Sequence, residues 1–117
     1  MKKHLVMTVM ALLGAALVLG EGITELVIGG GDPAVPQPLA TNEIRGKTLV
    51  FIGNKSARVP NAGTVWIQAS RTNDAPGIKL LSGQTISLTG GANGLDARQF
   101  WVDVETTNDG VVVLILQ

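Results

Sequence analysis

The stretch from Thr64 to Leu88, TVWIQASRTNDAPGIKLLSGQTISL, constrains the fold most strongly because turn-forming residues interrupt it twice. Its first part, Thr64–Gln68, contains β-branched and aromatic residues that suit a pleated, half-buried surface. Asn, Asp, Pro and Gly then favour a turn. Two later segments, Ile78–Leu80 and Thr85–Leu88, alternate apolar and polar residues. Three short strands with tight connections predict an all-β fold, either a small antiparallel β-sandwich or jelly-roll-like domain or a small barrel.

The same kind of pattern predicts strands on both sides of this stretch. Thr48–Ile52 is mostly apolar on both faces and is therefore expected to be a central strand. Gln99–Glu105 alternates cleanly between apolar and other residues. Phe100, Val102 and Val104 are therefore expected on one face of the strand. The Asp-Gly pair that follows predicts a hairpin between this strand and Val111–Leu116.

Composition excludes several functional classes. The 117 residues with 15 Gly and 3% aromatic residues suit one small, turn-rich domain. Lys and Arg number 9 against 9 Asp and Glu, so no basic stripe is available for phosphates and nucleic acid is not an expected partner. With no Cys and a single His, neither a thiolate or His-based metal site nor a catalytic triad can be assembled. We therefore expect no cofactor, no metal site and no enzymatic activity.

The N-terminal segment has a basic head, Met1–His4, followed by the uncharged run LVMTVMALLGAALVLG. Three interpretations stay open: a helical segment for assembly or capsid docking, a membrane span or retained signal, and a secretory signal cleaved after Gly20. As a helix the run would extend about 24 Å, short of the ~30 Å hydrocarbon layer. Ala11, Gly14 and Ala15 are small residues that would allow helices to approach closely.

The chain is predicted to have three parts. Residues 1–31 form the apolar N-terminal anchor or assembly segment, in which Ile23–Ile28 is either a strand or a continuation of the helix. Residues 32–38 contain three prolines and predict an extended linker. Residues 39–117 form the β-domain.

The apolar strand at the end of the chain carries a prediction about assembly. Six consecutive apolar residues, Val111–Leu116, would be an aggregation hazard as a bare edge. Small domains without disulfides are often stabilised by oligomerisation. We therefore expect a homo-oligomer, specifically a trimer, whose interface or attachment contacts include Leu12, Leu13, Leu17, Val112, Leu114 and Leu116.

Other residues have competing interpretations. Trp66 and Trp101 are candidate ligand-facing aromatics that could stack on a sugar, although strand tryptophans are more often core or interface anchors. Asp103 and Glu105, with Asp96 nearby, would suit a paired-carboxylate hydrolase or a Ca²⁺ site. Solvated positions on a half-exposed strand explain these carboxylates better.

A family resemblance points to a role. The chain resembles small tailed-phage virion proteins, the β-sandwich decoration, head-fibre and tail-associated proteins, through the segments Asn61–Ile67, Pro76–Leu80, Leu81–Leu88 and Gln99–Asp103 and the closing apolar strand. It departs from them at Ser82, where the family has proline, and in its apolar N-terminus. The resemblance implies a structural virion protein that contacts the major capsid protein or another virion protein. The alternative is a membrane-tethered or exported bacterial β-domain, in the membrane or periplasm, that binds a carbohydrate or a surface protein.

Overall fold

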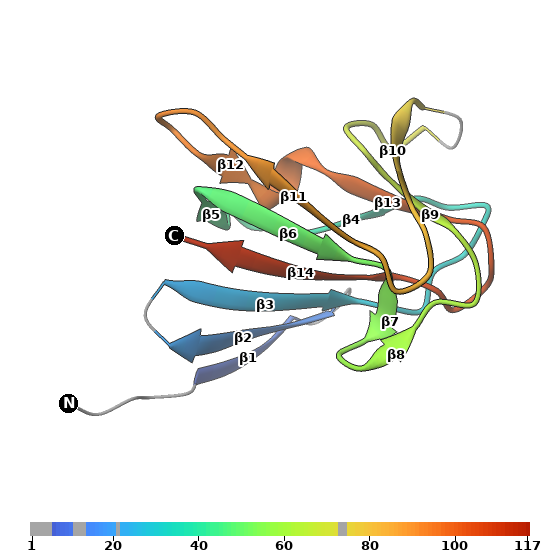
Figure 1. The fold of residues 1–117 in the computed structure, drawn as a ribbon, viewed down its shortest axis with the longest axis horizontal. Coiled ribbons are helices and arrows are strands. Elements are labelled where there is room, and N and C mark those ends of the chain that lie inside the picture. Colours follow the sequence, from blue (N-terminus) through green and yellow to red (C-terminus); the bar gives the residue numbers. More distant parts are fainter. Residues whose placement is uncertain (1–5, 11–13, 21, 73–74) are drawn as a thin grey trace.

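The computed structural model describes residues 6–10, 14–20, 22–72 and 75–117, which form antiparallel β-sheets and one short 3₁₀ helix (Figure 1). The elements are β1 (Val6–Met10), β2 (Gly14–Gly20), β3 (Ile23–Ile28), β4 (Gln37–Pro38), β5 (Arg45–Gly46), β6 (Thr48–Ile52), β7 (Asn54–Ser56), β8 (Val59–Pro60), β9 (Val65–Gln68), β10 (Gly77–Leu80), β11 (Thr85–Thr89), β12 (Leu95–Asp96), η1 (Ala97–Gln99), β13 (Trp101–Val104) and β14 (Val111–Leu116). The predicted all-β class is confirmed.

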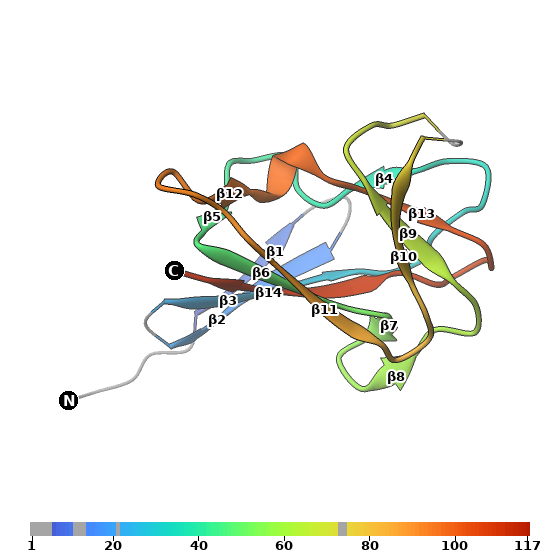
Figure 2. The same cartoon turned by 45° about the horizontal axis from the view of Figure 1, so that its top comes forward.

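Two sheets account for most of the strands. A six-stranded sheet has the order β1-β2-β3-β14-β6-β11, and a four-stranded sheet has the order β10-β9-β13-β4. Two short ladders, β12-β5 and β7-β8, lie at opposite ends of the six-stranded sheet. Figure 2 shows β4, β13 and β9 on one side of the molecule and β3 and β14 on the other.

One hydrophobic core lies between the two sheets, because every second residue of their strands points inward. The six-stranded sheet contributes side chains such as Leu26, Phe51 and Val113, and the four-stranded sheet contributes Ile67 and Val102. All five side chains are buried, with at most 2% of their surface exposed. The inner faces of β3, β14, β6, β9 and β13 are thereby committed to the core.

Several strand predictions are confirmed. β6 pairs with β14 on one side and with β11 on the other, so it is central, as its apolar sequence predicts. Ile86 and Leu88 both pack against the core from β11. Phe100 also packs there, with its ring centroid 5.7 Å from that of Phe51 in an edge-to-face arrangement.

The described residues at the beginning of the chain lie mostly in strands. Of the run expected to be helical, residues 6–10 and 14–19 lie in β1 and β2, while residue 5 and residues 11–13, including Leu12 and Leu13, are outside the described residues. β3 is inserted between β2 and β14 and buries Leu26 and Ile28 in the core. The expected linker also joins the fold, since β4 pairs with β13. Leu26 and Ile28 are two residues apart and therefore point to the same side of β3, which explains why both reach the core.

The Asp-Gly pair does not form the predicted hairpin, since β13 and β14 belong to different sheets. The carboxylate of Asp109 is instead buried and accepts hydrogen bonds from the backbone nitrogens of Ala62 and Gly63, at 2.9 and 2.7 Å. The side-chain amide of Asn61 exchanges two hydrogen bonds with the backbone of Gly110, at 2.7 and 2.9 Å. These bonds fix a crossover from one sheet to the other, so local turn chemistry was overridden by long-range contacts.

Candidate functional site

The outward-facing residues of β3, β14 and β6 form a largely aliphatic surface, which we call the aliphatic face. Strand pairing aligns these residues in rows across the sheet. Since Leu26, Val113 and Phe51 point into the core, their sequence neighbours point outward. The three rows are Ile23, Leu116 and Thr48; Glu25, Leu114 and Val50; and Val27, Val112 and Ile52.

The rows differ in how much solvent they contact. Val112 is only 1% exposed, because β7 lies against β14 and β3 at that end of the sheet. Leu114, Leu116 and Val50 are half-buried, and Ile23 is 38% exposed. The outward positions of the adjacent strand β11 are exposed Thr and Ser residues that border the aliphatic face.

These positions can be compared with the predicted contact residues. Leu114 and Leu116 lie on the aliphatic face and reach solvent, whereas Val112 lies on the same face but is covered by the chain itself. Leu17 is placed through its backbone alone, opposite Glu25 in the pairing of β2 with β3. Sequence reasoning missed Ile23 and the outward residues of β6. Their alternation can be read from the sequence, but the pairing of β3, β14 and β6 that places them side by side cannot.

The outer face of the four-stranded sheet has a different composition, and we call it the aromatic face. Trp66 lies between Lys79 and Asp103 across the strands. Trp101 lies in the next row, between Gln68 and Pro38. The two tryptophans are therefore diagonal neighbours on one face, with Cβ atoms about 7–8 Å apart or slightly less. Both side chains are half-buried and neither belongs to the core.

Two polar residues on the aromatic face are covered by their surroundings. Asp103 is 8% exposed, so it is not the solvated strand position that the sequence predicts for this carboxylate, and Gln68 is 2% exposed. The amide nitrogen of Gln68 donates hydrogen bonds to the backbone oxygens of Ser70 and Thr72, both at 2.7 Å. Its amide oxygen is buried and has no hydrogen-bond partner within the described part of the chain. Gln68 thus holds the backbone of residues 70–72 beside this face.

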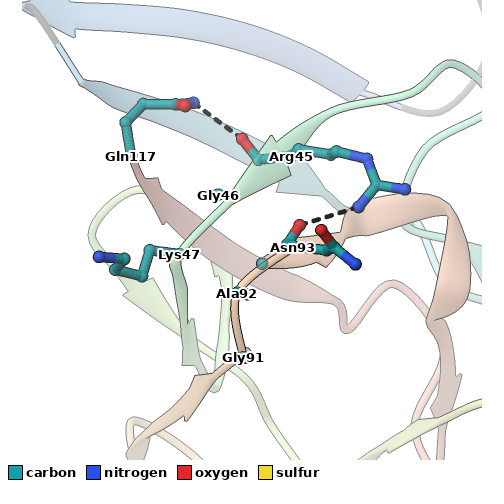
Figure 3. A pocket seen from close by; sticks show the side chains of 8 residues that line it. Arg45, Gly46, Lys47, Gly91, Ala92, Asn93 and Gln117 are labelled. Carbon is teal, nitrogen blue, oxygen red and sulfur yellow. Dashed lines mark hydrogen bonds between the residues drawn. The ribbon is translucent and has the colours of Figure 1, made fainter.

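A shallow hollow of about 180 Å³ lies where β5, β6, the β11–β12 turn and the end of β14 meet (Figure 3). Arg45 and Lys47 give the hollow a positive charge. The guanidinium of Arg45 is engaged, since it pairs with Glu43 and donates to the backbone oxygen of Asn93 at 3.1 Å. The amide nitrogen of Gln117 donates to the backbone oxygen of Arg45 at 2.8 Å. These bonds join strand ends, which is a structural role.

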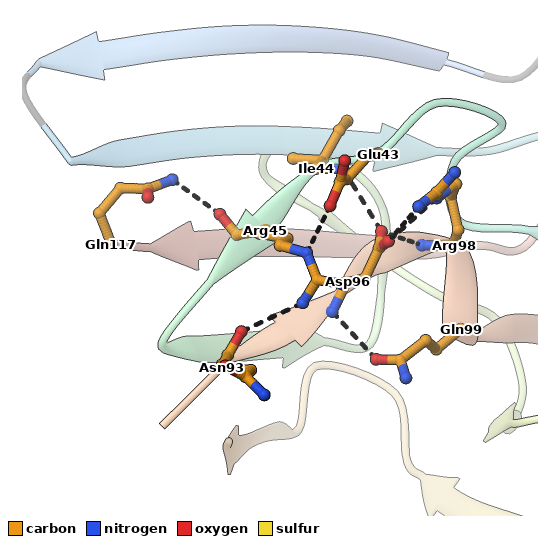
Figure 4. A network of polar contacts seen from close by, with 8 residues as sticks. All are labelled: Glu43, Ile44, Arg45, Asn93, Asp96, Arg98, Gln99 and Gln117. Atoms are coloured by element: carbon orange, nitrogen blue, oxygen red, sulfur yellow. Dashed lines mark hydrogen bonds and ion pairs between the residues drawn. The ribbon is translucent and has the colours of Figure 1, made fainter. Parts of the chain in front are cut away.

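Asp96 organises the neighbouring turn (Figure 4). Its carboxylate accepts hydrogen bonds from the backbone and guanidinium of Arg98, at 2.7 to 3.0 Å, and from the backbone nitrogen of Ile44 at 3.4 Å. Gln99 completes a capping box at the start of η1. The hydrogen bond from the Arg98 side chain holds the pKa of Asp96 below its usual value, which burial alone would raise. A carboxylate so fully engaged is unsuited to proton transfer.

The three carboxylates considered as a hydrolase or Ca²⁺ site do not converge on one centre. Asp96 binds Arg98, Asp103 lies on the aromatic face, and Glu105 accepts from the backbone nitrogen of Thr64 at 3.4 Å. Among the described residues, no group of three or more His, Asp or Glu side chains is arranged to hold a metal ion.

Comparison with known proteins gives no family assignment: no family model, curated protein or solved structure matches the chain. In the part of the chain that the structure describes, no helix is long and apolar enough to span a bilayer.

Proposed function

We propose that this chain is a structural virion protein: an oligomeric decoration or cement protein, or a fibre-base component, that acts through protein–protein contacts. The observation that carries the proposal is the aliphatic face, where Leu114, Leu116 and Val50 reach solvent from adjacent strands. The resemblance to β-sandwich proteins of tailed phages supports the choice of assembly. The proposed oligomer is a trimer, and its partner in the particle is the major capsid protein or another virion protein.

The chemistry of the aliphatic face suits a lasting contact. Burying apolar surface stabilises a complex by about 25 cal/mol per Å² removed from water. Among the outward positions of β3, β14, β6 and β11, Glu25 is the one charged residue. The Thr and Ser residues of β11 border the apolar centre on one side. An apolar centre with a polar margin is the usual anatomy of a protein interface.

Fractionation of cells that produce the native chain tests this function. We expect the chain in purified particles, where mass spectrometry finds its N-terminal segment intact. Recovery in a periplasmic or membrane fraction, with cleavage near Gly20, would instead support the exported bacterial domain and contradict the virion proposal. If the chain is found in particles, antibody labelling of the particle surface locates it on the capsid or at a fibre base.

A further inference from the structure

The aromatic face combines two partly exposed indole rings with hydrogen-bonding groups. Trp66 and Trp101 are half-buried, so part of each side chain reaches solvent. Lys79, beside Trp66, is exposed and forms no ion pair with any described residue. Gln68, which lies opposite Trp101 at the end of β9, binds the backbone of Ser70 and Thr72. The face is thus bordered by an exposed donor and by the backbone of Ser70 and Thr72.

We propose that the aromatic face binds an oligosaccharide, with neighbouring pyranose rings packed on Trp66 and Trp101. A pyranose ring has an apolar C–H face and a rim of hydroxyl groups. Indole rings pack against the C–H face, and polar groups beside the indoles bind the hydroxyl groups. Asp103 beside Trp66 is only 8% exposed, so Lys79 is the charged group next to Trp66 that reaches solvent, and its ammonium can donate hydrogen bonds to sugar hydroxyl groups.

The spacing of the two tryptophans selects an extended ligand over a single sugar. Diagonal neighbours on a sheet have side chains about 7–8 Å apart, close enough for adjacent rings of one glycan to contact both. A ligand that touches both indoles fixes its direction along the diagonal from Trp66 to Trp101. Each indole then contributes to the affinity. Loss of one indole weakens binding, while the sugar ring on the other indole keeps its contact.

Tryptophan fluorescence tests the proposal directly because the chain contains two Trp and no Tyr. The probes are cellohexaose, N-acetylchitohexaose and maltohexaose, titrated into the full-length protein. We expect a saturable emission change with at least one probe, and about tenfold weaker binding or worse in Trp66→Ala and in Trp101→Ala. Trp66→Phe and Trp101→Phe retain an aromatic ring, bind more tightly than the alanine variants, and each leave one indole as reporter.

Val59→Ala is the matched control, because Val59 is 45% exposed and lies on the separate β7–β8 ladder. It should bind the glycan as the unmodified chain does. The proposal is overturned if none of the three probes changes the emission, or if both alanine variants retain full affinity with unchanged circular dichroism. A sugar-independent emission shift with protein concentration, lost in the alanine variants, would assign the face to a protein contact and also overturn it.

Light scattering on the same samples separates this proposal from the assembly function. If the unmodified chain forms the oligomer but binds none of the glycans, the glycan site alone is refuted. Glycan binding by a monomer refutes assembly alone.

Discussion

The outer faces of the two sheets share one core but offer different chemistry to a partner. The aliphatic face consists of Leu, Ile and Val side chains on adjacent strands, with one threonine and a single carboxylate. The aromatic face alternates tryptophan with Lys, Asp and Gln. Depletion of charge favours lasting protein contacts, whereas aromatic rings beside polar groups favour reversible recognition of a polar ligand. We propose that the two faces serve two different roles.

The largest effect on stability is expected from a substitution that disrupts the packing of the two sheets and therefore both outer faces. A Cβ atom at Gly110 would clash with the backbone oxygen of Ile28, in the crossover between the sheets. We expect Gly110→Ala to destabilise the fold by more than about 3 kcal/mol, as severe clashes in a packed interior do. Urea unfolding followed by circular dichroism measures this loss. In Gly91→Ala, where the new Cβ meets nothing within 4 Å, the stability should change by less than about 0.5 kcal/mol.

A change confined to the aliphatic face should separate the two roles. Leu114→Glu places a carboxylate where we propose that a partner buries apolar surface, and an unpaired buried charge costs several kcal/mol. We expect the oligomer to dissociate while glycan binding persists. Size-exclusion chromatography with light scattering gives the mass. Ser87→Glu adds the same charge in the same row, on exposed β11, and should leave the oligomer intact. Equal masses for the two variants would contradict the placement of the interface.

Removing the one carboxylate of the aliphatic face should strengthen assembly. Glu25 lies opposite Leu114, so close packing of another subunit would take its charge out of water. We expect Glu25→Gln to tighten the oligomer about tenfold, which corresponds to ~1.4 kcal/mol. Sedimentation velocity over a dilution series measures the change, with Glu43→Gln as the control at the Arg45 pair. Weaker assembly in Glu25→Gln would show that this carboxylate makes a favourable contact.

The smallest effect is expected outside both faces, at Asp96. Because Arg98 lowers the pKa of Asp96 in the folded state, this carboxylate stabilises the fold above its usual pKa of 3.8. That contribution is lost as the pH falls through the lowered value. We expect Asp96→Asn to cost about 1 kcal/mol at pH 7, since the Arg98 side chain is partly exposed and the pair is screened. Thermal unfolding from pH 7 to pH 2 should show the variant and the original chain converge in acid; a constant difference would contradict this assignment.

Strands such as β11 and β13 were predictable from sequence because their apolar residues alternate locally, whereas β4 lies in the expected linker and was not predicted. Phe100, Val102 and Val104 could be assigned to one face by their period alone, and the core confirms them. The pairing of strands was not predictable in the same way. Asn108 to Gly110 has the composition of a hairpin turn, but the buried bonds of Asp109 to residues far earlier in the chain direct it into a crossover.

The candidate faces were harder to predict than the strands. Leu114 and Leu116 were identified from a run of apolar residues, but the row that joins Leu114 to Val50 exists only through pairing between distant strands. The diagonal relation of Trp66 and Trp101 likewise depends on the pairing of β9 with β13, which the sequence does not show. The covering of Val112 depends on β7, a strand that carries no apolar signal of its own.

Carbene footprinting of the full-length chain at several concentrations tests the central claim most directly. The account predicts that β14 and β6 are weakly labelled at high protein concentration and that their labelling rises on dilution, as the oligomer dissociates. Labelling of Trp66 and Trp101 should stay constant across the series. Equal labelling of Leu114 and Val50 at every concentration, together with a monomer mass throughout, would show that the aliphatic face has no protein partner of its own kind.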